Sequence, residues 1–404
     1  MLKNILHVSY SKSGGAGNVA AQLSTAQSLL DDYKSNFLYA TETNLKSNPF
    51  NNLGLTVRAA FDNFVIKNQT WPSLFSIYRN VQDPYFYNNL IKHKGILHLH
   101  WLNGILNLDS IVNHAKMGKK IIWTIHDMEP FTGGCHNSND CKNFEESCSE
   151  CPAVKQIFRS KIQQTKISKN LYLSLMNNVK LVFPSQWLLN NFRSGAPQYS
   201  SALEVIPNPV SDIYFEKDFS ATNLLNTHKE HLVLGFVCSD LNDPIKQFDK
   251  VLNAIQEVSL LIKKPIKLFA VGAQFKNFPK GLNYEIIESG VVSNKNNLRD
   301  IYSKLDLLIS NSISESFGLT IAEASAVGVP SLVLAGSGSS ELIKDNSTGF
   351  IYINQVDLIS KLIKISESEN LIHEIGAKAR ENAFIQWKLE NVLKKYDKLY
   401  ENLL

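Results

Sequence analysis

The chain of 404 residues is 44% hydrophobic and 19% charged, which fits two or three domains with full cores and excludes disordered, collagen-like and disulfide-miniprotein classes. No apolar run reaches the ~18 residues of a membrane-spanning helix, and the N-terminus is too short and polar for a signal peptide, so we expect a cytoplasmic protein. Residues 1–200 carry about 20 basic against about 12 acidic side chains. This basic half fits an anionic acceptor, an anionic membrane surface or a solvated helix face.

Short β-branched runs alternate with longer amphipathic stretches along the first half of the chain. The first run, residues 4–10, predicts a strand that ends in a glycine-rich turn, and a helix follows to about residue 30. Near-continuous apolar runs separated by helical stretches are typical of a parallel sheet that is covered on both faces. The further strands predicted in this half are 36–40, 95–101, 120–126 and 180–184.

The same alternation restarts in the second half, after a stretch of low periodicity. Prolines within residues 195–210 indicate that the chain crosses there between domains. We therefore predict an α/β protein of two doubly wound, Rossmann-like domains that face a cleft, residues 1–200 and 201–385, with a C-terminal helix at 386–404 that braces back towards the first domain. The strands predicted in the second domain are 232–238, 266–272, 284–287, 305–310, 330–334 and 350–353.

Two motifs lie in loops that follow predicted strands, where open α/β sheets bind ligands. The first is Gly14-Gly15-Ala16-Gly17, between a strand and a helix, where backbone amides at a helix N-terminus favour an anion. It lacks the full dinucleotide-binding pattern. A purely structural tight turn is therefore the alternative for these glycines.

The second motif, within residues 309–330, places an apolar strand, a polar loop and a helix in succession. Glu315 lies just before the helix, which begins near residues 317–319, and Glu323 lies inside it. Amides for phosphate and carboxylates for hydroxyls suit a nucleotide sugar. A capping role for Glu315 and an ordinary surface position for Glu323 are the alternatives.

The run from Glu315 to Glu323 resembles the motif of two glutamates separated by seven residues in retaining glycosyltransferases of the GT-B fold, family 4 in the broad sense. The resemblance covers nearly the whole chain and includes the Gly14 loop and the strand-end His126. It implies transfer of a hexose-type sugar from a UDP- or GDP-sugar to a glycan, lipid-linked or protein acceptor in surface polysaccharide or glycoconjugate synthesis. It also implies retention of configuration and no catalytic metal.

The resemblance further implies a role for each matching residue. Glu315 would steady the positive charge that develops on the transferred sugar, and His126 would contact that sugar, so both are assigned as catalytic. The alternative for His126 is a strand-end histidine capped by Asp127. Glu323 would hold the ribose hydroxyls. The other residues assigned to donor binding are Gly14, Gly15, Lys246, Asp240, Ser316, Phe317, Gly318, Leu319 and Thr320.

One departure from the family lies at the start of the second domain. The family binds the donor diphosphate there with an arginine and a lysine. Lys246 fits the lysine, but the arginine position holds Ser239 or Asp240. An aspartate would repel a diphosphate unless it bonds the ribose or holds Lys246. The departure keeps open a catalytically silent GT-B subunit that binds an acceptor or a partner transferase. A GT-B epimerase or phosphorylase is a weaker third hypothesis.

Four cysteines gather in a loop at 132–152: Cys135, Cys141, Cys148 and Cys151. A Cys-x2-Cys arm with two further thiols favours a closed, structural zinc site, with His136 as a substitute ligand. Disulfides and free thiols are the alternatives, of which a reducing compartment disfavours disulfides. A similar cysteine-bearing insert occurs in a subset of the family, and its place beside His126 suggests that it shapes the acceptor entrance.

Two further features each have a structural and a functional interpretation. His98 and His100 share one face of a predicted strand, which favours packing or acceptor contact over a metal pair because no third ligand has helpful spacing. The stretch Lys155–Lys180 interleaves lysines with apolar residues and predicts a basic amphipathic helix for peripheral contact with the inner face of a membrane. Lys166 and Lys169 are two of its bases. No feature indicates a nucleic-acid partner.

Overall fold

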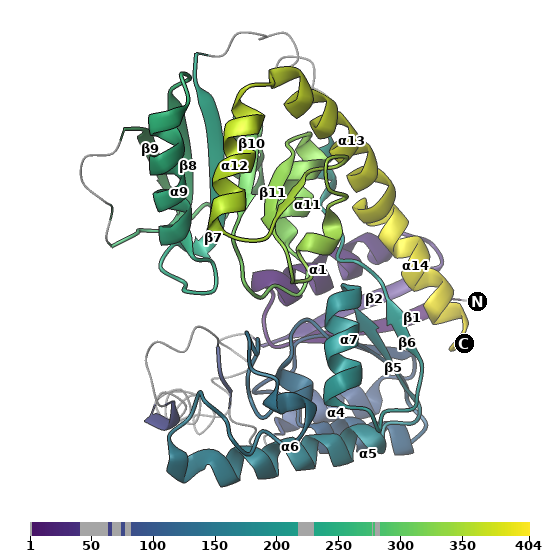
Figure 1. Ribbon diagram of the computed structural model, residues 1–404. Coiled ribbons are helices and arrows are strands. Elements are labelled where there is room, and N and C mark those ends of the chain that lie inside the picture. Colours follow the sequence, from purple (N-terminus) through teal and green to yellow (C-terminus); the bar gives the residue numbers. More distant parts are fainter. Residues whose placement is uncertain are drawn as a thin grey trace. The chain divides into compact units, whose positions relative to one another are not determined.

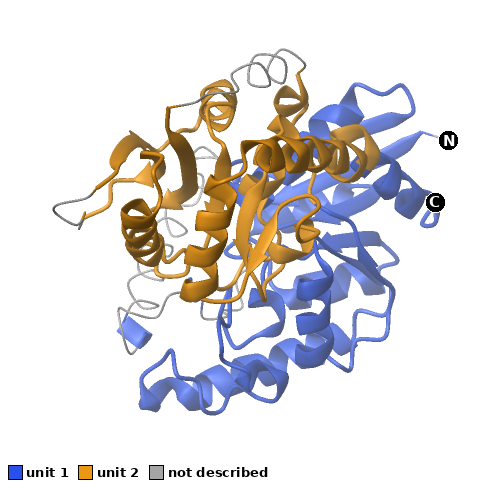
Figure 2. Cartoon of the chain, turned by 45° about the horizontal axis from the view of Figure 1, so that its top comes forward, with its two compact units in different colours: residues 1–207, 392–404 blue, residues 208–391 orange. Residues whose placement is uncertain are grey.

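The computed structural model describes residues 2–40, 64–66, 74–76, 82–216, 230–276, 278 and 283–404. The chain divides into two compact units (Figure 2). Unit 1 contains residues 1–207 together with 392–404, and unit 2 contains residues 208–391. The chain therefore passes from one unit to the other at two places, after Pro207 and after Asn391.

The described part of unit 1 is built on a parallel sheet with the strand order β2-β1-β3-β4-β5-β6 (Figure 1). Its strands are β1 (Lys3–Ser9), β2 (Tyr33–Tyr39), β3 (Ile96–Leu99), β4 (Lys120–Thr124), β5 (Val179–Phe183) and β6 (Leu203–Val205). Its helices are α1 (Gly14–Ser28), α4 (Pro84–Lys92), α5 (Leu108–Lys116), α6 (Arg159–Ser174), α7 (Gln186–Gly195) and most of α14 (Leu389–Glu401).

Alternate residues of this sheet serve two different environments, because successive side chains of a strand point to opposite faces. Leu6 and Val8 of β1, Leu97 of β3 and Trp123 of β4 join the main hydrophobic core. The intervening residues face the other way. His7 pairs in register with His98, and both are fully buried. The second face of the sheet is thus buried but partly polar.

Unit 2 contains a second parallel sheet with the strand order β12-β11-β10-β7-β8-β9 (Figure 1). Its strands are β7 (Leu232–Asp240), β8 (Ile266–Ala273), β9 (Glu285–Gly290), β10 (Leu307–Ser310), β11 (Ser331–Leu334) and β12 (Phe350–Tyr352). Its helices are α9 (Phe248–Leu261), α10 (Lys295–Tyr302), α11 (Leu319–Val327), α12 (Gln355–Ser366) and α13 (Glu369–Trp387), with a 3-10 turn η4 (Asp212–Phe215).

Two apolar clusters cover the two faces of the second sheet. Leu234 and Phe236 of β7 pack with residues of α9 and α12. Val233, one residue earlier, packs into a separate cluster with α10, α11 and η4. Helices on both faces explain why the strands read as nearly continuous apolar runs.

The predicted fold class is confirmed: both sheets are parallel, and helices flank them. The predicted strands recur with small changes in their bounds. The short edge strand β6 was not predicted, because its three residues fall within the proline-bearing stretch interpreted as a domain crossing. The expected crossing at 200/201 lies within unit 1, whose first segment extends to Pro207.

Candidate functional site

The loop between β10 and α11 carries the glutamate motif and ends in a glycine that the backbone requires. Gly318 precedes α11 with φ +97°, a left-handed conformation that glycine adopts without strain. A Cβ at this position would lie 3.0 Å from the Cβ of Ser339. No side chain caps α11, so the first amides of the helix, those of Leu319 and Thr320, keep their donors for another partner. The amino end of α11 therefore favours an anion.

Lys246 and Glu315 form an ion pair within unit 2. Lys246 lies in the loop after β7, and Glu315 lies three residues before Gly318. Their side chains keep 22% and 29% of their exposure, so both remain open to solvent. Burial alone would lower the pKa of Lys246, but the Glu315 carboxylate outweighs burial and raises it. A permanent positive charge therefore stands beside a carboxylate near the amino end of α11.

Glu323 accepts hydrogen bonds from two tyrosines that sequence reasoning missed. The hydroxyl of Tyr302, at the end of α10, donates to Glu323 over 3.1 Å, and the hydroxyl of Tyr214 in η4 also bonds it. Burial raises the pKa of Glu323 to about 7. Tyr302 is the last residue of α10, and nothing in the sequence links it or Tyr214 to Glu323.

The other predicted donor residues of unit 2 lie around the same loop and strand end. Ser316 is half-buried, whereas the ring of Phe317 is buried and packs edge-on against Trp387, with ring centroids 6.3 Å apart. Asp240 is exposed at the end of β7 and accepts from the backbone and the side-chain amide of Asn242, each at 2.9 Å. Asp240 therefore does not hold Lys246, whose carboxylate partner is Glu315.

The glycine loop of unit 1 opens α1. Gly14 has φ +77°, and Gly14 and Gly15 are both exposed, with no atom within 4 Å of a Cβ built on either. Gly17 is different, because its Cβ would lie 2.3 Å from the backbone oxygen of Ser11. Gly17 is thus required for close packing, whereas Gly14 and Gly15 leave their backbone accessible.

His126 follows β4 and hydrogen-bonds another histidine. Its Nε2 lies 3.1 Å from Nδ1 of His100, and burial lowers the pKa of His126 to about 4, so the ring is neutral at pH 7. Asp127 does not cap His126. Its carboxylate accepts from Nδ1 of His136 over 2.7 Å and from the amide of Glu129 over 2.9 Å.

The cysteine loop places Cys135, Cys148 and Cys151 in the core, with Cys141 half-buried. A hydrogen bond joins Cys135 to Cys151, and this bond raises the pKa of Cys135 and lowers that of Cys151. Among the residues that the structure describes, three ligand atoms come within 4.8 Å of one another only at His7, His98 and His100. The ring nitrogens of His136 bond Asp127 and Ser76, so His136 is not available as a substitute ligand.

The prediction of a basic, membrane-facing helix is wrong for its two central lysines. Lys166 and Lys169 of α6 are fully buried. Lys166 donates to the carbonyls of Phe131 and Gly195, and burial lowers its pKa to about 8. Lys169 donates to the carbonyl and the carboxylate of Glu129, the latter over 2.6 Å. Both lysines fasten the turn that follows His126 instead of facing solvent.

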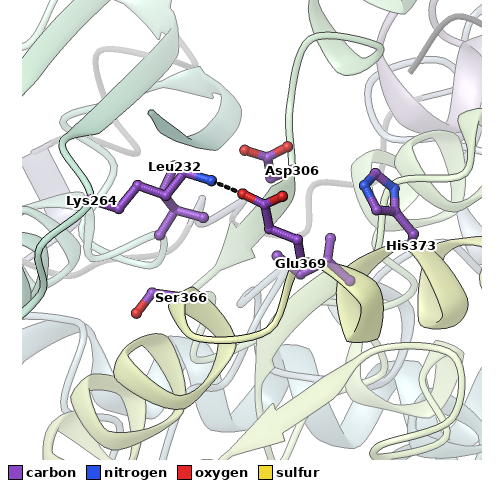
Figure 3. Close-up of a pocket in the computed structure, with 7 residues that line it drawn as sticks. Leu232, Lys264, Asp306, Ser366, Glu369 and His373 are labelled. Carbon is purple, nitrogen blue, oxygen red and sulfur yellow. Dashed lines mark hydrogen bonds and ion pairs between the residues drawn. The ribbon is translucent and has the colours of Figure 1, made fainter. Parts of the chain in front are cut away.

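One small pocket lies at the opposite end of the second sheet, where its strands begin (Figure 3). Lys264 and Glu369 form an ion pair at its wall. The pocket is remote from the loops after the strands and contains none of the predicted site residues. Its lining residues are Leu232, Lys264, Asp306, Ser366, Glu369, Ile372 and His373.

Comparison with known proteins gives one family match, which lies within unit 2. Residues 236–382 match the family described as glycosyl transferases group 1, a span that contains Lys246, Glu315 and Glu323. The WcaC protein of Escherichia coli (strain K12), named as a colanic acid biosynthesis glycosyl transferase, is 21% identical over 321 residues, which are 78% of this chain and 76% of WcaC. Within the described residues, no helix has the length and apolar composition needed to cross a membrane.

Solved structures match the fold over the whole chain. A sucrose-phosphate synthase from Thermosynechococcus elongatus aligns with a TM-score of 0.65 and 13% identity over 99% of both chains. HepE from Anabaena, solved with UDP and glucose, aligns with a TM-score of 0.63 and 14% identity over 99% of this chain and 100% of HepE. The family match over residues 236–382, the similarity to WcaC and the fold of the solved structures together support a glycosyltransferase of the GT-B fold.

Proposed function

We propose that the chain is a retaining glycosyltransferase that moves a hexose-type sugar from a nucleoside-diphosphate sugar to a glycan, lipid-linked or protein acceptor, and that it acts in surface polysaccharide or glycoconjugate synthesis. The observation that carries the proposal is the arrangement around α11. An uncapped helix start, the Lys246–Glu315 ion pair and the half-buried Glu323 lie in one unit, and the two glutamates have the spacing of the family motif.

The proposed chemistry follows from the charges that develop when the sugar leaves. The departing diphosphate gains negative charge, which the amides of Leu319 and Thr320 and the ammonium of Lys246 stabilise without reorganising. The sugar gains positive charge, which the Glu315 carboxylate stabilises. Lys246 can bond the diphosphate and the Glu315 carboxylate together because its ammonium has three donors. A fixed cation and a helix dipole supply the charge that a catalytic metal supplies elsewhere, so the proposed reaction is metal-independent.

The remaining assigned groups bind the substrate. Glu323 is proposed to accept hydrogen bonds from the ribose, and Gly14 and Gly15 offer accessible backbone to the donor. His126 is proposed to contact a hydroxyl of the sugar. HepE, one of the similar structures, was solved with UDP and glucose, which supports a UDP-sugar as the first donor to test. Retention is proposed by front-face displacement.

The first test is a panel of UDP- and GDP-sugars in a thermal-shift assay, with free nucleotides as controls. A donor at 100 times its Kd should add about 2.7 kcal/mol to the free energy of unfolding. Glu315→Gln should keep the shift but abolish transfer of the sugar that gives it. No shift with any nucleotide would favour the silent GT-B subunit, for which Ser239 or Asp240 in place of the family arginine is the specific observation.

A structural zinc ion in the cysteine loop is a second part of the proposal. Four thiols in one loop, three of them buried, form the donor set of a closed zinc site. Elemental analysis of the full chain should give one zinc per molecule. The ion should be lost in Cys148→Ala and retained in Cys238→Ala, because Cys238 belongs to β7 of unit 2 and not to the cysteine loop. A metal-free wild-type protein with the same stability would refute the zinc site.

Peripheral membrane contact is proposed through the apolar part of α6 and the turn before it. Ile157, Ile167 and Leu171 are exposed by 77%, 55% and 59%. Because Lys166 and Lys169 are buried, insertion of these apolar side chains should contribute more than charge. Ile167→Ser with Leu171→Ser should abolish co-sedimentation with vesicles, whereas Lys161→Gln should weaken it only at low salt. Equal sedimentation of both variants would contradict this.

A further inference from the structure

The second face of the sheet in unit 1 carries a cluster of buried imidazoles. His7, His98 and His100 are 0%, 0% and 2% exposed, and His126 lies beside them at the end of β4. His98 and His100 stand two residues apart and therefore share one face, and His7 lies on that face because it pairs in parallel register with His98. Gln27 of α1 completes the cluster and is fully buried.

A continuous chain of hydrogen bonds runs through four of these side chains. His126 Nε2 lies 3.1 Å from His100 Nδ1, and His100 Nε2 lies 3.1 Å from His7 Nδ1. His7 Nε2 lies 2.8 Å from the amide oxygen of Gln27. That oxygen also accepts from the hydroxyl of Ser35 over 3.1 Å. This series of hydrogen bonds therefore begins at the Gln27 amide oxygen, which can only accept. It ends at His126, the ring predicted to be catalytic.

The direction of every bond in this chain follows from its first member. Each neutral imidazole has one N–H and one lone pair. Burial lowers the pKa of His7 to about 4 and that of His100 well below its usual value, so the rings are neutral at pH 7. Since Gln27 Oε1 accepts, His7 donates through Nε2 and accepts at Nδ1. His100 must then donate through Nε2, and so must His126.

A second branch holds the Gln27 amide in this orientation. The Gln27 side-chain nitrogen donates to the hydroxyl of Tyr400 over 3.3 Å. That hydroxyl lies 2.7 Å from His98 Nδ1, and His98 Nε2 lies 2.8 Å from the Thr124 hydroxyl. If the amide turned over, both branches would have to reverse together, which ties the orientation of Gln27 to many bonds at once.

The three histidines whose ligand atoms lie within 4.8 Å of one another could also suggest a metal site. Both ring nitrogens of His7, His98 and His100 have a hydrogen-bond partner within the described residues. A metal would displace several of these bonds, some of them with Tyr400 and Thr124. The cluster is therefore explained better by hydrogen bonding than as a set of metal ligands. The series Gln27, His7, His100 and His126 is called the histidine relay below.

We propose that Gln27, acting through His7 and His100, fixes His126 as the Nε2–H tautomer, so that its Nδ1 accepts a hydrogen bond from a sugar hydroxyl. Gln27, His7 and His100 are thus positioning residues for His126. The role at the hydroxyl rests on the proposed function, whereas the tautomer itself does not. A hydroxyl that donates to His126 leaves its own oxygen lone pairs free for other donors.

The test is long-range ¹H–¹⁵N NMR of the full chain labelled at histidine, which distinguishes protonated from unprotonated ring nitrogens. Wild-type His126 should show one tautomer, with the proton on Nε2. Gln27→Leu removes the anchor, and the His126 nitrogens, two imidazoles away, should become averaged between tautomers. Gln27→Glu keeps an oxygen acceptor for His7 and should restore the wild-type spectrum.

The matched control is Tyr396→Phe, which removes a hydroxyl 3.2 Å from the Thr124 hydroxyl and no hydrogen bond of Gln27, His7, His100 or His126. It should leave the His126 nitrogens unchanged. A proton on Nδ1 in wild type, or an unchanged His126 spectrum in a folded Gln27→Leu protein, would overturn the proposal. If Gln27→Leu does not fold, His7→Gln supplies the second interruption of the relay, with the same expected averaging at His126.

Kinetic measurements distinguish failure of the His126 tautomer proposal from failure of the glycosyltransferase proposal. Once a donor is known, Gln27→Leu should lower kcat at least about tenfold with KM within about twofold, because only the orientation of a catalytic contact is lost. If the spectra are as expected but no nucleotide sugar binds or reacts, the transferase proposal fails and the relay stands. If transfer is observed and His126 is averaged in wild type, the relay fails alone.

Discussion

Lys246 and Glu315 are two opposite charges that solvent still reaches, and each is proposed to need the other. The carboxylate raises the pKa of the lysine, and the lysine fixes the carboxylate beside the start of α11. Solvent partly screens this half-buried ion pair, which limits its contribution to folding. The pair is therefore better explained by the charges of a reaction than by stability.

Replacement of Lys246 should accordingly affect catalysis more than folding. Lys246→Ala should lower kcat/KM by roughly 10²–10³, the usual loss when one preorganised electrostatic partner of a transition state is removed. Lys246→Arg keeps the charge and should recover part of the activity. Steady-state kinetics with circular dichroism checks this. An active Lys246→Ala enzyme would remove the lysine from the mechanism.

Glu323 should make donor binding depend on pH near neutrality. Its pKa is raised to about 7 by burial, and the carboxylate accepts stronger hydrogen bonds from the proposed ribose hydroxyls than the protonated acid does. Donor Kd should therefore weaken by up to about tenfold per pH unit below pH 7. Calorimetric titration of the donor at pH values from roughly 5 to 8, which lie on both sides of the folded pKa, measures this. A flat profile in wild type would contradict the role.

The same carboxyl group should affect folding in the opposite sense. The folded pKa lies above the ordinary value of 4.5, so the folded state binds the proton more tightly than the unfolded state. The Glu323 contribution to stability is therefore full at low pH and is lost as the pH rises through about 7. Glu323→Gln removes this contribution, and its urea unfolding should depend less on pH over that window than wild type.

At the scale of elements, the start of α11 depends on one backbone conformation. Gly318→Ala places a Cβ 3.0 Å from Ser339 at a positive φ, and such strain costs of order 1–3 kcal/mol. The helix start should shift, and affinity for a nucleoside diphosphate should fall with it. Gly290→Ala is the control, because it has a positive φ but no atom within 4 Å of the added Cβ. Equal nucleotide affinity in both variants would refute a role for the α11 amides.

The same element shows what sequence reasoning could and could not supply. The α11 motif is local, so its glutamates, its glycine and its helix start were all readable in order along the chain. The hydroxyls of Tyr302 and Tyr214 reach Glu323 from elsewhere, and no spacing in the sequence encodes that meeting.

Helix α6 shows side chains that the sequence places wrongly. Its lysines fit a basic surface by composition, yet two of them turn inward, because the turn around Glu129 and Phe131 presents carbonyls that need buried donors. Likewise His98 and His100 were recognised as one strand face, but only the parallel register with β1 and β4 reveals His7, Thr124 and His126 beside them.

At the scale of the whole molecule, unit 1 depends on residues from both ends of the sequence. Asp397 of α14 accepts from the Tyr33 hydroxyl over 2.6 Å and pairs with Lys3, and Tyr400 bonds His98. Truncation after Asn391 should therefore loosen β1, β2 and β3 while unit 2 keeps its protection. Hydrogen exchange read by mass spectrometry measures both units in one sample, and uniform loss of protection would contradict this division.

Unit 1 is made of two separate segments of the sequence, and this sets the order in which the two units are completed during synthesis. A ribosome completes residues 208–391 before it adds Val392, so unit 2 has its whole sequence while unit 1 still lacks the helix that covers its histidine face. Domains generally fold as they emerge. The nascent chain therefore holds an inserted domain ready to fold between two parts of an unfinished one. The polar face of the sheet in unit 1 stays exposed to water until residues 392–404 are added, so the histidine cluster can be covered only after unit 2 has its whole sequence.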